Sequence, residues 1–408
     1  MRPCPLVSTS VPSWSKTICS TFFGSILSIC PFVYLHRTHL GVEINSMHSR
    51  AFSEDLQAKI DKYKALRNPI QLGDVHFESP LILAPMAGIC TPPFRLLMED
   101  LGAGGTVSEL ISAHGINHGN QRTRDMLKID EREENIGIQL FGEDPESMAQ
   151  ACEVVQRENP KFVDINMGCP VRKVVSKGGG SALMKEIEAL APLFAQMKKA
   201  LDVPLSIKIR MGWDAEGINA DKIEEVARNE GIEWVAIHGR TRAQQYTGSA
   251  NWDYIEEFAK GATLPIIGNG DLHQAHQVAA RMENTNCKAL MIARGCLRNP
   301  FIFLESLAFD PTETESPFKG KDYFEAIERY YQYCLEAYDR ERTILIQARK
   351  IIVWFAAGFP SAAKFRSLMF QSKTLDETMK IAEDYFKSLG EQGKRINYDE
   401  AFMNGGHG

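Results

Sequence analysis

The chain of 408 residues has no Cys-x-x-Cys pair, although it contains nine cysteines. Structural zinc sites usually take their ligands from such pairs, so the sequence predicts no metal site. The odd number and the wide spacing of the cysteines are typical of free thiols in a reducing compartment. We therefore expect a cytoplasmic protein.

The chain also lacks a strong excess of charge of either sign. Its 46 Lys and Arg residues and 52 Asp and Glu residues give a formal net charge of −6 at pH 7. This balance excludes a protein that is basic throughout, so any contact with a nucleic acid must rest on a local basic surface. A hydrophobic content of 44% is ordinary for a globular protein, and the length suffices for one large domain and a smaller one.

Charged residues are absent from residues 17–35, which lie in a leader of residues 1–46. The stretch has features of a signal segment, a marginal membrane anchor or a transit segment, and Met47 offers an alternative start without it. A glycine, a proline and five hydroxyl residues interrupt the apolar run, which argues against a stable membrane-spanning helix. The sequence leaves organellar targeting and membrane association through this leader open.

From about residue 70, short apolar runs rich in β-branched residues alternate with stretches of helical periodicity. Eight runs predict strands over residues 81–84, 105–107, 136–140, 162–165, 205–209, 234–238, 265–268 and 289–292. Between them, helices are predicted over 145–157, 186–200, 221–229, 252–260 and 272–281. This alternation predicts an α/β fold, a (β/α)₈ TIM barrel over residues 70–310, in preference to an open doubly wound sheet.

Helical periodicity alone marks the two ends of this region. Residues 47–69 are predicted to form an N-terminal helix and linker. After the barrel, apolar spacing predicts helices over residues 323–337, 344–357, 361–370 and 375–389. We therefore expect a small all-helical C-terminal domain over 320–390, followed by a flexible tail of residues 391–408.

The turn Asn166-Met167-Gly168-Cys169-Pro170 follows the fourth predicted strand, and Lys177-Gly178-Gly179-Gly180-Ser181 comes shortly after it. In a (β/α)₈ barrel the active site lies at the C-terminal ends of the strands. A cysteine there is poorly placed for packing and well placed to meet a ligand, beside glycines that permit close backbone approach. Cys169 is compatible with four roles: a nucleophile with His238 as its base, a metal ligand, a general acid or an inert loop thiol.

Glycine-rich turns follow the last two predicted strands, at residues 268–271 and 293–295. Loops at these positions commonly form a phosphate site in such barrels, and Arg294 adds a bidentate donor. The alternative is a pair of ordinary turns. A phosphate site would fit a phosphorylated cofactor such as flavin mononucleotide (FMN).

Three further polar residues come at strand ends, namely Gln139, Lys208 and His238. A lysine in a strand that faces the barrel interior must be paired or face a ligand, because burying an unpaired ammonium is costly. Lys208 suits the N1/C2=O edge of a reduced flavin, and Gln139 offers a donor and an acceptor to a pyrimidine-like ring. The alternatives are a lysine that reaches solvent and a histidine satisfied within the core.

Taken in order, the motifs resemble those of the tRNA-dihydrouridine synthases over residues 70–310. They are Ala84-Pro85-Met86-Ala87-Gly88, Asn166 to Pro170, Lys177 to Leu183, Ile207 to Trp213, His238-Gly239-Arg240-Thr241, Gly268-Asn269-Gly270-Asp271 and Ala293-Arg294-Gly295. The resemblance extends into the helical region through Arg349-Lys350 and Phe365-Arg366. The chain departs from the family pattern after Gly88, where residues 89–95 lack the usual aspartate.

The resemblance implies an FMN-bearing barrel, a helical tRNA-binding domain and NADPH or NADH as reductant. It implies that Cys169 protonates C5 of a uracil while reduced flavin delivers hydride to C6. Carried over to this chain, the flavin ring contacts are Pro85, Met86, Gln139, Lys208 and His238, and the phosphate contacts are Asn269, Gly270, Arg294 and Gly295. The implied substrate or RNA contacts are Asn166, Arg172, Lys173, Lys177, Arg349, Lys350, Lys364 and Arg366.

Two other functions compete with this interpretation. One is an FMN-dependent dehydrogenase of a free pyrimidine, of the dihydroorotate or dihydropyrimidine type. The other is a non-catalytic RNA-binding protein on the same fold. The basic residues of the helical region favour tRNA as the partner, and the intact set of Cys169, Lys208 and His238 favours an enzyme. We expect a monomer with no stable protein partner.

Overall fold

The computed structural model describes residues 51–390, except 311 and 313–315, together with residues 396–400 and 402. The expectations for the leader of residues 1–46 and for Met47 lie outside these residues. Within the described part of the chain, no helix is both long and apolar enough to cross a membrane.

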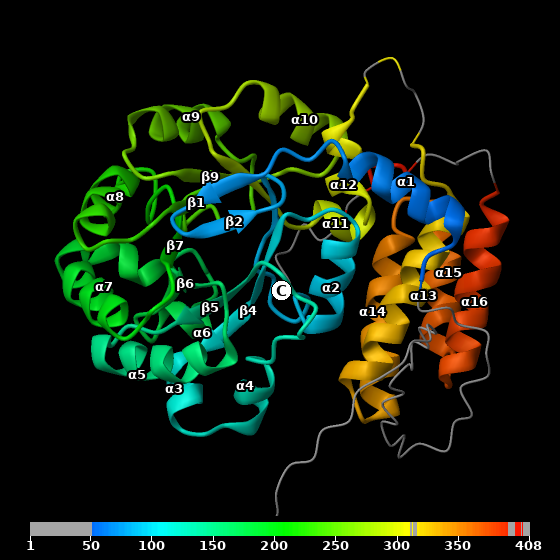
Figure 1. Cartoon of the computed structure of the whole chain (residues 1–408), viewed down its shortest axis with the longest axis horizontal. Coiled ribbons are helices and arrows are strands. Elements are labelled where there is room, and N and C mark those ends of the chain that lie inside the picture. The colour runs from blue at the N-terminus through cyan, green and yellow to red at the C-terminus, as the bar shows by residue number, and fades with distance from the viewer. Residues whose placement is uncertain (1–50, 311, 313–315, 391–395, 401, 403–408) are drawn as a thin grey trace, which may run out of the picture. The chain divides into compact units, whose positions relative to one another are not determined.

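Eight parallel strands close into a barrel, as predicted (Figure 1). They are β3 (Leu81–Leu83), β4 (Gly105–Ser112), β5 (Ile136–Phe141), β6 (Phe162–Asn166), β7 (Leu205–Arg210), β8 (Val235–His238), β9 (Ile266–Asn269) and β10 (Ala289–Ile292). Each strand pairs with the next along the chain, and β10 pairs with β3 to complete the ring. The predicted TIM barrel is confirmed.

Helices connect the strands on the outside of the barrel. They include α2 (Pro92–Asp100), α3 (Ala113–Asn117), α4 (Gln121–Asp125), α5 (Pro145–Val155), α7 (Leu190–Lys199), α8 (Ala220–Asn229), α9 (Trp252–Gly261) and α10 (Ala275–Glu283). Helix α10 begins later than the predicted start at residue 272. The reason is that Gln274 caps its N-terminus and Asp271 has a positive φ of 50°, which a helix excludes.

A short hairpin of β1 (Ile70–Leu72) and β2 (Val75–Phe77) adds aromatic and aliphatic side chains to the cluster that fills the barrel interior. Phe77 packs against Phe162 and Trp234 with ring centroids 5.9 Å and 6.1 Å away. Phe162 is the first residue of β6 and Trp234 directly precedes β8, so this aromatic cluster fills the N-terminal end of the barrel. The C-terminal end is therefore the end available for a ligand.

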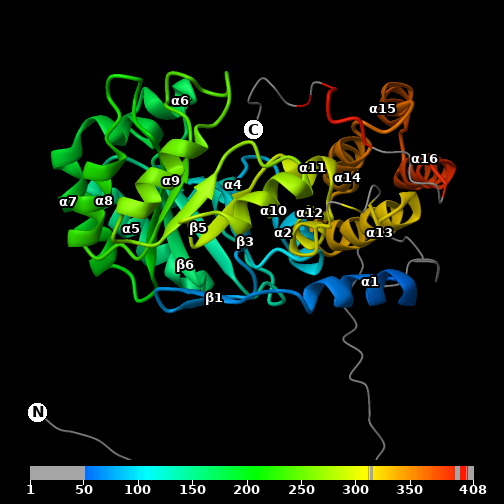
Figure 2. The ribbon, with the colours of Figure 1, turned by 90° about the horizontal axis from the view of Figure 1, so that it is seen from above.

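Four helices follow the barrel after the short helices α11 (Gly295–Arg298) and α12 (Ile302–Leu307). They are α13 (Gly320–Ala337), α14 (Glu341–Phe355), α15 (Ala362–Gln371) and α16 (Leu375–Ser388), and they lie beside the barrel (Figure 2). Asp100 on α2 accepts hydrogen bonds from Arg329 Nε at 3.0 Å and from Tyr333 Oη at 2.6 Å, both on α13. These contacts fix α13 against the barrel.

The first helix and part of the tail also join the two regions. In α1 (Glu54–Lys64), Lys59 Nζ reaches the buried carboxylate of Asp322 on α13 at 3.1 Å. Within the tail predicted to be flexible, residues 396–400 are described and contact the barrel. The guanidinium of Arg298 donates to the carbonyls of Tyr398 and Glu400, at 3.3 Å and 2.8 Å.

One buried ion pair holds the segment after β3. Arg95 on α2 donates from Nε and Nη2 to the two carboxylate oxygens of Glu133, at 2.5 Å and 2.8 Å. It also donates to the carbonyls of Cys90 and Lys128. Both charged side chains are almost wholly buried, at 1% and 0% exposure, so each depends on the other for its neutralisation.

Replacing Arg95 with Met should therefore leave Glu133 buried without a partner and lower the free energy of unfolding by about 3–5 kcal/mol. The matched control is Lys128→Met, which breaks the solvent-exposed pair with Asp125 and should change stability by no more than about 1 kcal/mol. Urea titration of both variants measures the difference. Equal shifts of the two unfolding midpoints would contradict a special role for the buried pair.

Candidate active site at the mouth of the barrel

A cavity of about 290 Å³ opens where the strands end. Residues from loops or strand ends around the ring line it together. The predicted site residues among them are Pro85, Met86, Gln139, Asn166, Cys169, Lys208, His238, Asn269, Gly270 and Arg294. Gly295 is buried directly behind Arg294, at the first position of α11. The closed barrel thus brings together residues up to about half the chain apart in sequence.

The turn that carries Cys169 is held through its backbone. The amide of Cys169 donates to Asn166 Oδ1 at 2.9 Å, and its carbonyl accepts from the amide and hydroxyl of Ser181. The neighbouring carbonyl of Gly168 accepts from Arg210 Nε at 2.7 Å. Burial raises the pKa of the Cys169 thiol, and a backbone hydrogen bond and the Arg210 charge oppose this shift only in part. The thiol therefore carries its proton at neutral pH.

The glycine run after this turn has a steric cause. Gly180 has a positive φ of 59°, and a Cβ on it would lie 2.8 Å from the carbonyl oxygen of Cys169. Any larger residue would push the turn away from the segment that follows it. The glycines therefore pack this segment against the cysteine turn.

Lys208 presents an ammonium group to the cavity. Its Nζ donates to Asn269 Oδ1 at 3.0 Å, and Asn269 Nδ2 donates to the carbonyl of Met291, which fixes that orientation. Among the described residues, no carboxylate lies within ion-pair distance of Lys208. Burial and the charge of Arg210 lower its pKa to about 8, against the attraction of Asp164. Lys208 is thus mostly charged at neutral pH and suited to an electron-rich ligand.

His238 is neutral and its tautomer is determined by a neighbour. Burial lowers its pKa well below the usual value, and the charges of Arg210, Lys208 and Arg240 add to the effect. Arg240 Nη1 lies 3.2 Å from Nε2 of His238, and because a guanidinium only donates, Nε2 accepts and Nδ1 carries the proton. This geometry leaves His238 Nε2 engaged by Arg240, which disfavours His238 as a base for a Cys169 nucleophile.

A cluster of cations lies at the ends of β9 and β10. Asp271 accepts both terminal nitrogens of Arg240, at 2.9 Å and 2.8 Å, and lies 3.3 Å from Arg294 and 3.7 Å from His273. Burial opposes ionisation of Asp271, but hydrogen bonds from His273 and Arg240 outweigh it and hold its pKa below the usual range. One carboxylate thus faces two arginines, which leaves a positive surplus suited to a phosphate.

The glycines at this end allow neighbouring segments of the backbone to pack closely. Gly270 has a φ of +136°, and a Cβ on it would lie 2.5 Å from the Cβ of Ala250. A Cβ on Gly295 would lie 2.4 Å from the carbonyl oxygen of Leu272. Neither position can accept a side chain without moving the backbone, so the loops after β9 and β10 can pack closely around the cavity.

The basic residues predicted to meet RNA fall into two groups. Arg172 and Lys173, in the short helix α6 (Arg172–Val175), and Lys177 are exposed beside the cysteine turn, and Lys364 and Arg366 are exposed on α15. Arg349 and Lys350 on α14 are only half-exposed. Arg349 Nε donates to Ser372 Oγ at 3.2 Å, and Lys350 donates to the carbonyl of Gly88 in the loop after β3. These two side chains therefore serve internal contacts.

Four polar residues that line the cavity received no role from the sequence, namely Arg210, Tyr246, Asp271 and His273. The sequence does place Arg210 at a strand end, two residues beyond Lys208 on the same strand and so on the same face. Asp271 follows Asn269-Gly270 directly. Tyr246 comes from the loop between β8 and α9 and lies 5.5 Å from the guanidinium of Arg210, a contact that no local pattern signals.

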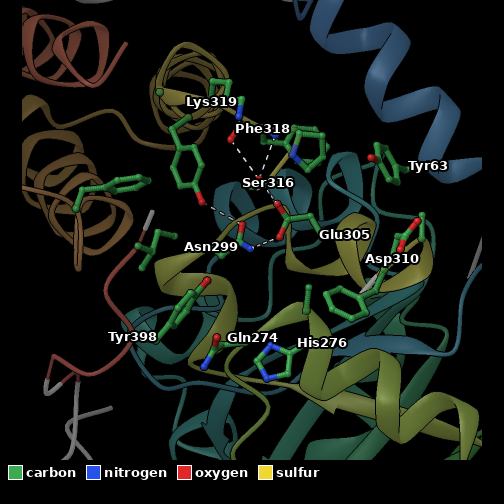
Figure 3. Close-up of a pocket in the computed structure, with 18 of the residues that line it drawn as sticks. Tyr63, Gln274, His276, Asn299, Glu305, Asp310, Ser316, Phe318, Lys319 and Tyr398 are labelled. Carbon is green, nitrogen blue, oxygen red and sulfur yellow. Dashed lines mark hydrogen bonds between the residues drawn. The ribbon is translucent and has the colours of Figure 1, made fainter. Parts of the chain in front are cut away.

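A second cavity, of about 310 Å³, lies between the barrel and the C-terminal helices (Figure 3). Glu305 and Asn299 point toward each other there, with Asn299 Nδ2 donating to Glu305 at 2.5 Å and Tyr323 donating to Asn299 at 3.1 Å. These contacts join the two regions of the chain. In the part of the chain that the structure describes, no group of three or more His, Cys, Asp or Glu side chains is placed to hold a metal ion.

Comparisons with known proteins show the family to which the chain is similar. A family model described as dihydrouridine synthase matches residues 82–390. A probable tRNA-dihydrouridine synthase of Rickettsia prowazekii is 32% identical over 325 residues, which cover 78% of this chain and 98% of the relative. The tRNA-dihydrouridine synthase B of Xanthomonas axonopodis is 33% identical over 320 residues, or 78% of this chain and 96% of the relative.

Among solved structures, histamine dehydrogenase from Rhizobium sp. 4-9 is similar with a TM-score of 0.47 and 11% sequence identity. The match covers 66% of this chain and 51% of that chain. At this distance the similarity has no bearing on the chemistry of the site.

Proposed function

The chain belongs to the dihydrouridine synthase family, and on that basis we propose that it uses FMN and NADPH to reduce the C5=C6 bond of specific uridines in tRNA. The observation that carries this proposal is the shared cavity. There the protonated thiol of Cys169 lies in one space with Lys208, Gln139 and the cationic ends of β9 and β10.

The residues of the cavity fit FMN in their chemistry. Lys208, without a carboxylate partner in the described chain, suits the N1/C2=O edge of the ring, and Gln139 offers polar atoms beside Pro85 and Met86. Arg294, with the backbone at Gly270 and Gly295, suits the phosphate. When bound and reduced by NADPH or NADH, FMN supplies the hydride for C6 of the uracil.

Cys169 supplies the proton in this proposal. Its raised pKa keeps the thiol protonated, which a general acid requires. Asn166 orients groups beside it, because its side chain is held between the Cys169 amide and Gln139. Arg210 keeps the turn in place through the carbonyl of Gly168. After transfer, the thiolate that remains lies near the Arg210 charge, which favours it electrostatically.

The substrate must bring a uridine into the mouth of the barrel, out of the folded tRNA. The exposed Arg172, Lys173 and Lys177 lie beside the cavity, and Lys364 and Arg366 are exposed on α15. Backbone contacts of this kind position RNA without reading its sequence. A free-pyrimidine dehydrogenase has no use for these cations, so they favour tRNA over the free base.

Cys169→Ala should keep the flavin and its reduction by NADPH but slow dihydrouridine formation by at least about 10²-fold, the usual contribution of a general acid. The matched control is Cys152→Ala in α5, a buried thiol away from the cavity. Stopped-flow reoxidation of the reduced flavin by tRNA separates the two half-reactions. Normal reoxidation in Cys169→Ala would rule out the acid role.

Lys208 predicts a pH dependence of FMN binding. The ammonium carries its charge below its pKa of about 8, and this charge is lost as the pH rises through that value. The dissociation constant of FMN should therefore increase about tenfold between pH 7 and pH 9, as expected for one required proton. Lys208→Met should bind FMN weakly at both pH values. A wild-type constant that is flat from pH 7 to pH 9 would contradict the assignment.

The double variant Lys364→Glu/Arg366→Glu should weaken tRNA binding about tenfold or more, because each substitution removes a cation that neutralises an RNA phosphate. The slope of log affinity against log salt concentration should also become shallower. Lys380→Glu/Lys387→Glu makes the same charge change on α16, where both lysines already pair with acidic residues of their own helix. Filter binding at several salt concentrations compares them. If both double variants weaken binding equally, α15 is not a specific RNA surface.

A further inference from the structure

Asp164 is a buried carboxylate that the proposed reaction does not use. It lies in β6, and its register partners are Gln139 on β5 and Ser206 on β7. Gln139 Nε2 donates to its Oδ2 at 2.7 Å, and Ser206 Oγ donates to its Oδ1 at 2.6 Å. The side chain does not line the cavity, although its hydrogen-bond partner Gln139 does.

A continuous chain of hydrogen bonds joins Asp164 to the cysteine turn. Asp164 accepts from Gln139, whose Oε1 accepts from Asn166 Nδ2 at 2.8 Å. Asn166 Oδ1 in turn accepts from the amide of Cys169 at 2.9 Å. Every link runs in the same direction, from the backbone donor at Cys169 down to the carboxylate.

The two ends of this series of hydrogen bonds determine the direction in which each bond donates. A backbone N–H can only donate, so Asn166 must turn its oxygen toward Cys169 and its amide nitrogen toward Gln139. Gln139 must then turn its oxygen toward Asn166 and its nitrogen toward Asp164. The last member must accept at that atom, which a carboxylate does and an aliphatic side chain cannot. If Gln139 turned over, two donors or two acceptors would face each other along the chain.

We propose that Asp164 is a positioning residue for Cys169, acting through the amide groups of Gln139 and Asn166; this inference rests on the proposed acid role of that thiol. Burial raises the pKa of Asp164 to about 6, against the hydrogen bonds from Ser206 and Gln139 and the attraction of Lys208, so it remains an acceptor at neutral pH. Asp164 is not among the residues that line the cavity.

The test compares Asp164→Leu, which removes the acceptor, with Asp164→Asn, which can still offer an oxygen to Gln139. Thr106→Val is the control, since it removes a buried hydroxyl of another barrel strand that is outside the chain of hydrogen bonds. Two readouts are measured on the holoenzyme. One is the rate of flavin reoxidation by tRNA, and the other is the rate of Cys169 alkylation by iodoacetamide, followed by mass spectrometry of its peptide.

In Asp164→Leu we expect reoxidation by tRNA to slow at least about tenfold, and by a clearly larger factor than flavin reduction by NADPH. Cys169 should be alkylated several-fold faster, because the released turn exposes a half-buried thiol. Asp164→Asn should give intermediate values on both readouts, and Thr106→Val should match the wild type. If Asp164→Leu does not fold, the rates of flavin reoxidation and of Cys169 alkylation in Asp164→Asn decide for or against the proposal.

Wild-type alkylation and reoxidation rates in the Asp164 variants would overturn the proposal. The alkylation readout needs no tRNA, so it also separates this inference from the proposed function. A protein that fails to reduce tRNA but shows faster alkylation in Asp164→Leu would refute the activity and keep the positioning role.

Discussion

The hydrogen bond from the Cys169 amide to Asn166 holds the turn that carries the proposed general acid. It joins the turn after β6 to the side chains of the barrel interior, and Arg210 and Ser181 hold the same turn from two further directions. The barrel supplies the fixed frame for these contacts, because β5, β6 and β7 are paired in register at this level. The thiol is therefore positioned by the backbone of its turn.

Around this turn the cavity carries more positive than negative charge. Lys208 and Arg210 face it from β7, and Arg240 and Arg294 share the single carboxylate of Asp271. Such a surplus costs stability in the protein alone, since burial lowers the pKa of each of Lys208, Arg210 and Arg294. An anionic cofactor relieves that cost, so its binding and the stability of the protein should be coupled.

The arrangement of the strands could be predicted because each one is a short apolar run followed by a polar or glycine-rich turn. The same pattern predicted which residues meet at the mouth, since strand ends in a barrel form one ring. It could not predict that Arg349 and Lys350 serve internal contacts, because both depend on partners in distant segments, at Ser372 and Gly88. The order of hydrogen bonds from Asp164 to Cys169 was equally hidden, since it depends on register between strands.

The proposed activity is tested most directly by treating unmodified tRNA with the purified holoenzyme and NADPH and mapping each uridine by mass spectrometry. The account predicts that specific uridines gain the mass of two hydrogens and that the gain disappears in Cys169→Ala. Turnover of free uracil or dihydroorotate with unchanged tRNA would contradict it and would make the protein a dehydrogenase of small pyrimidines.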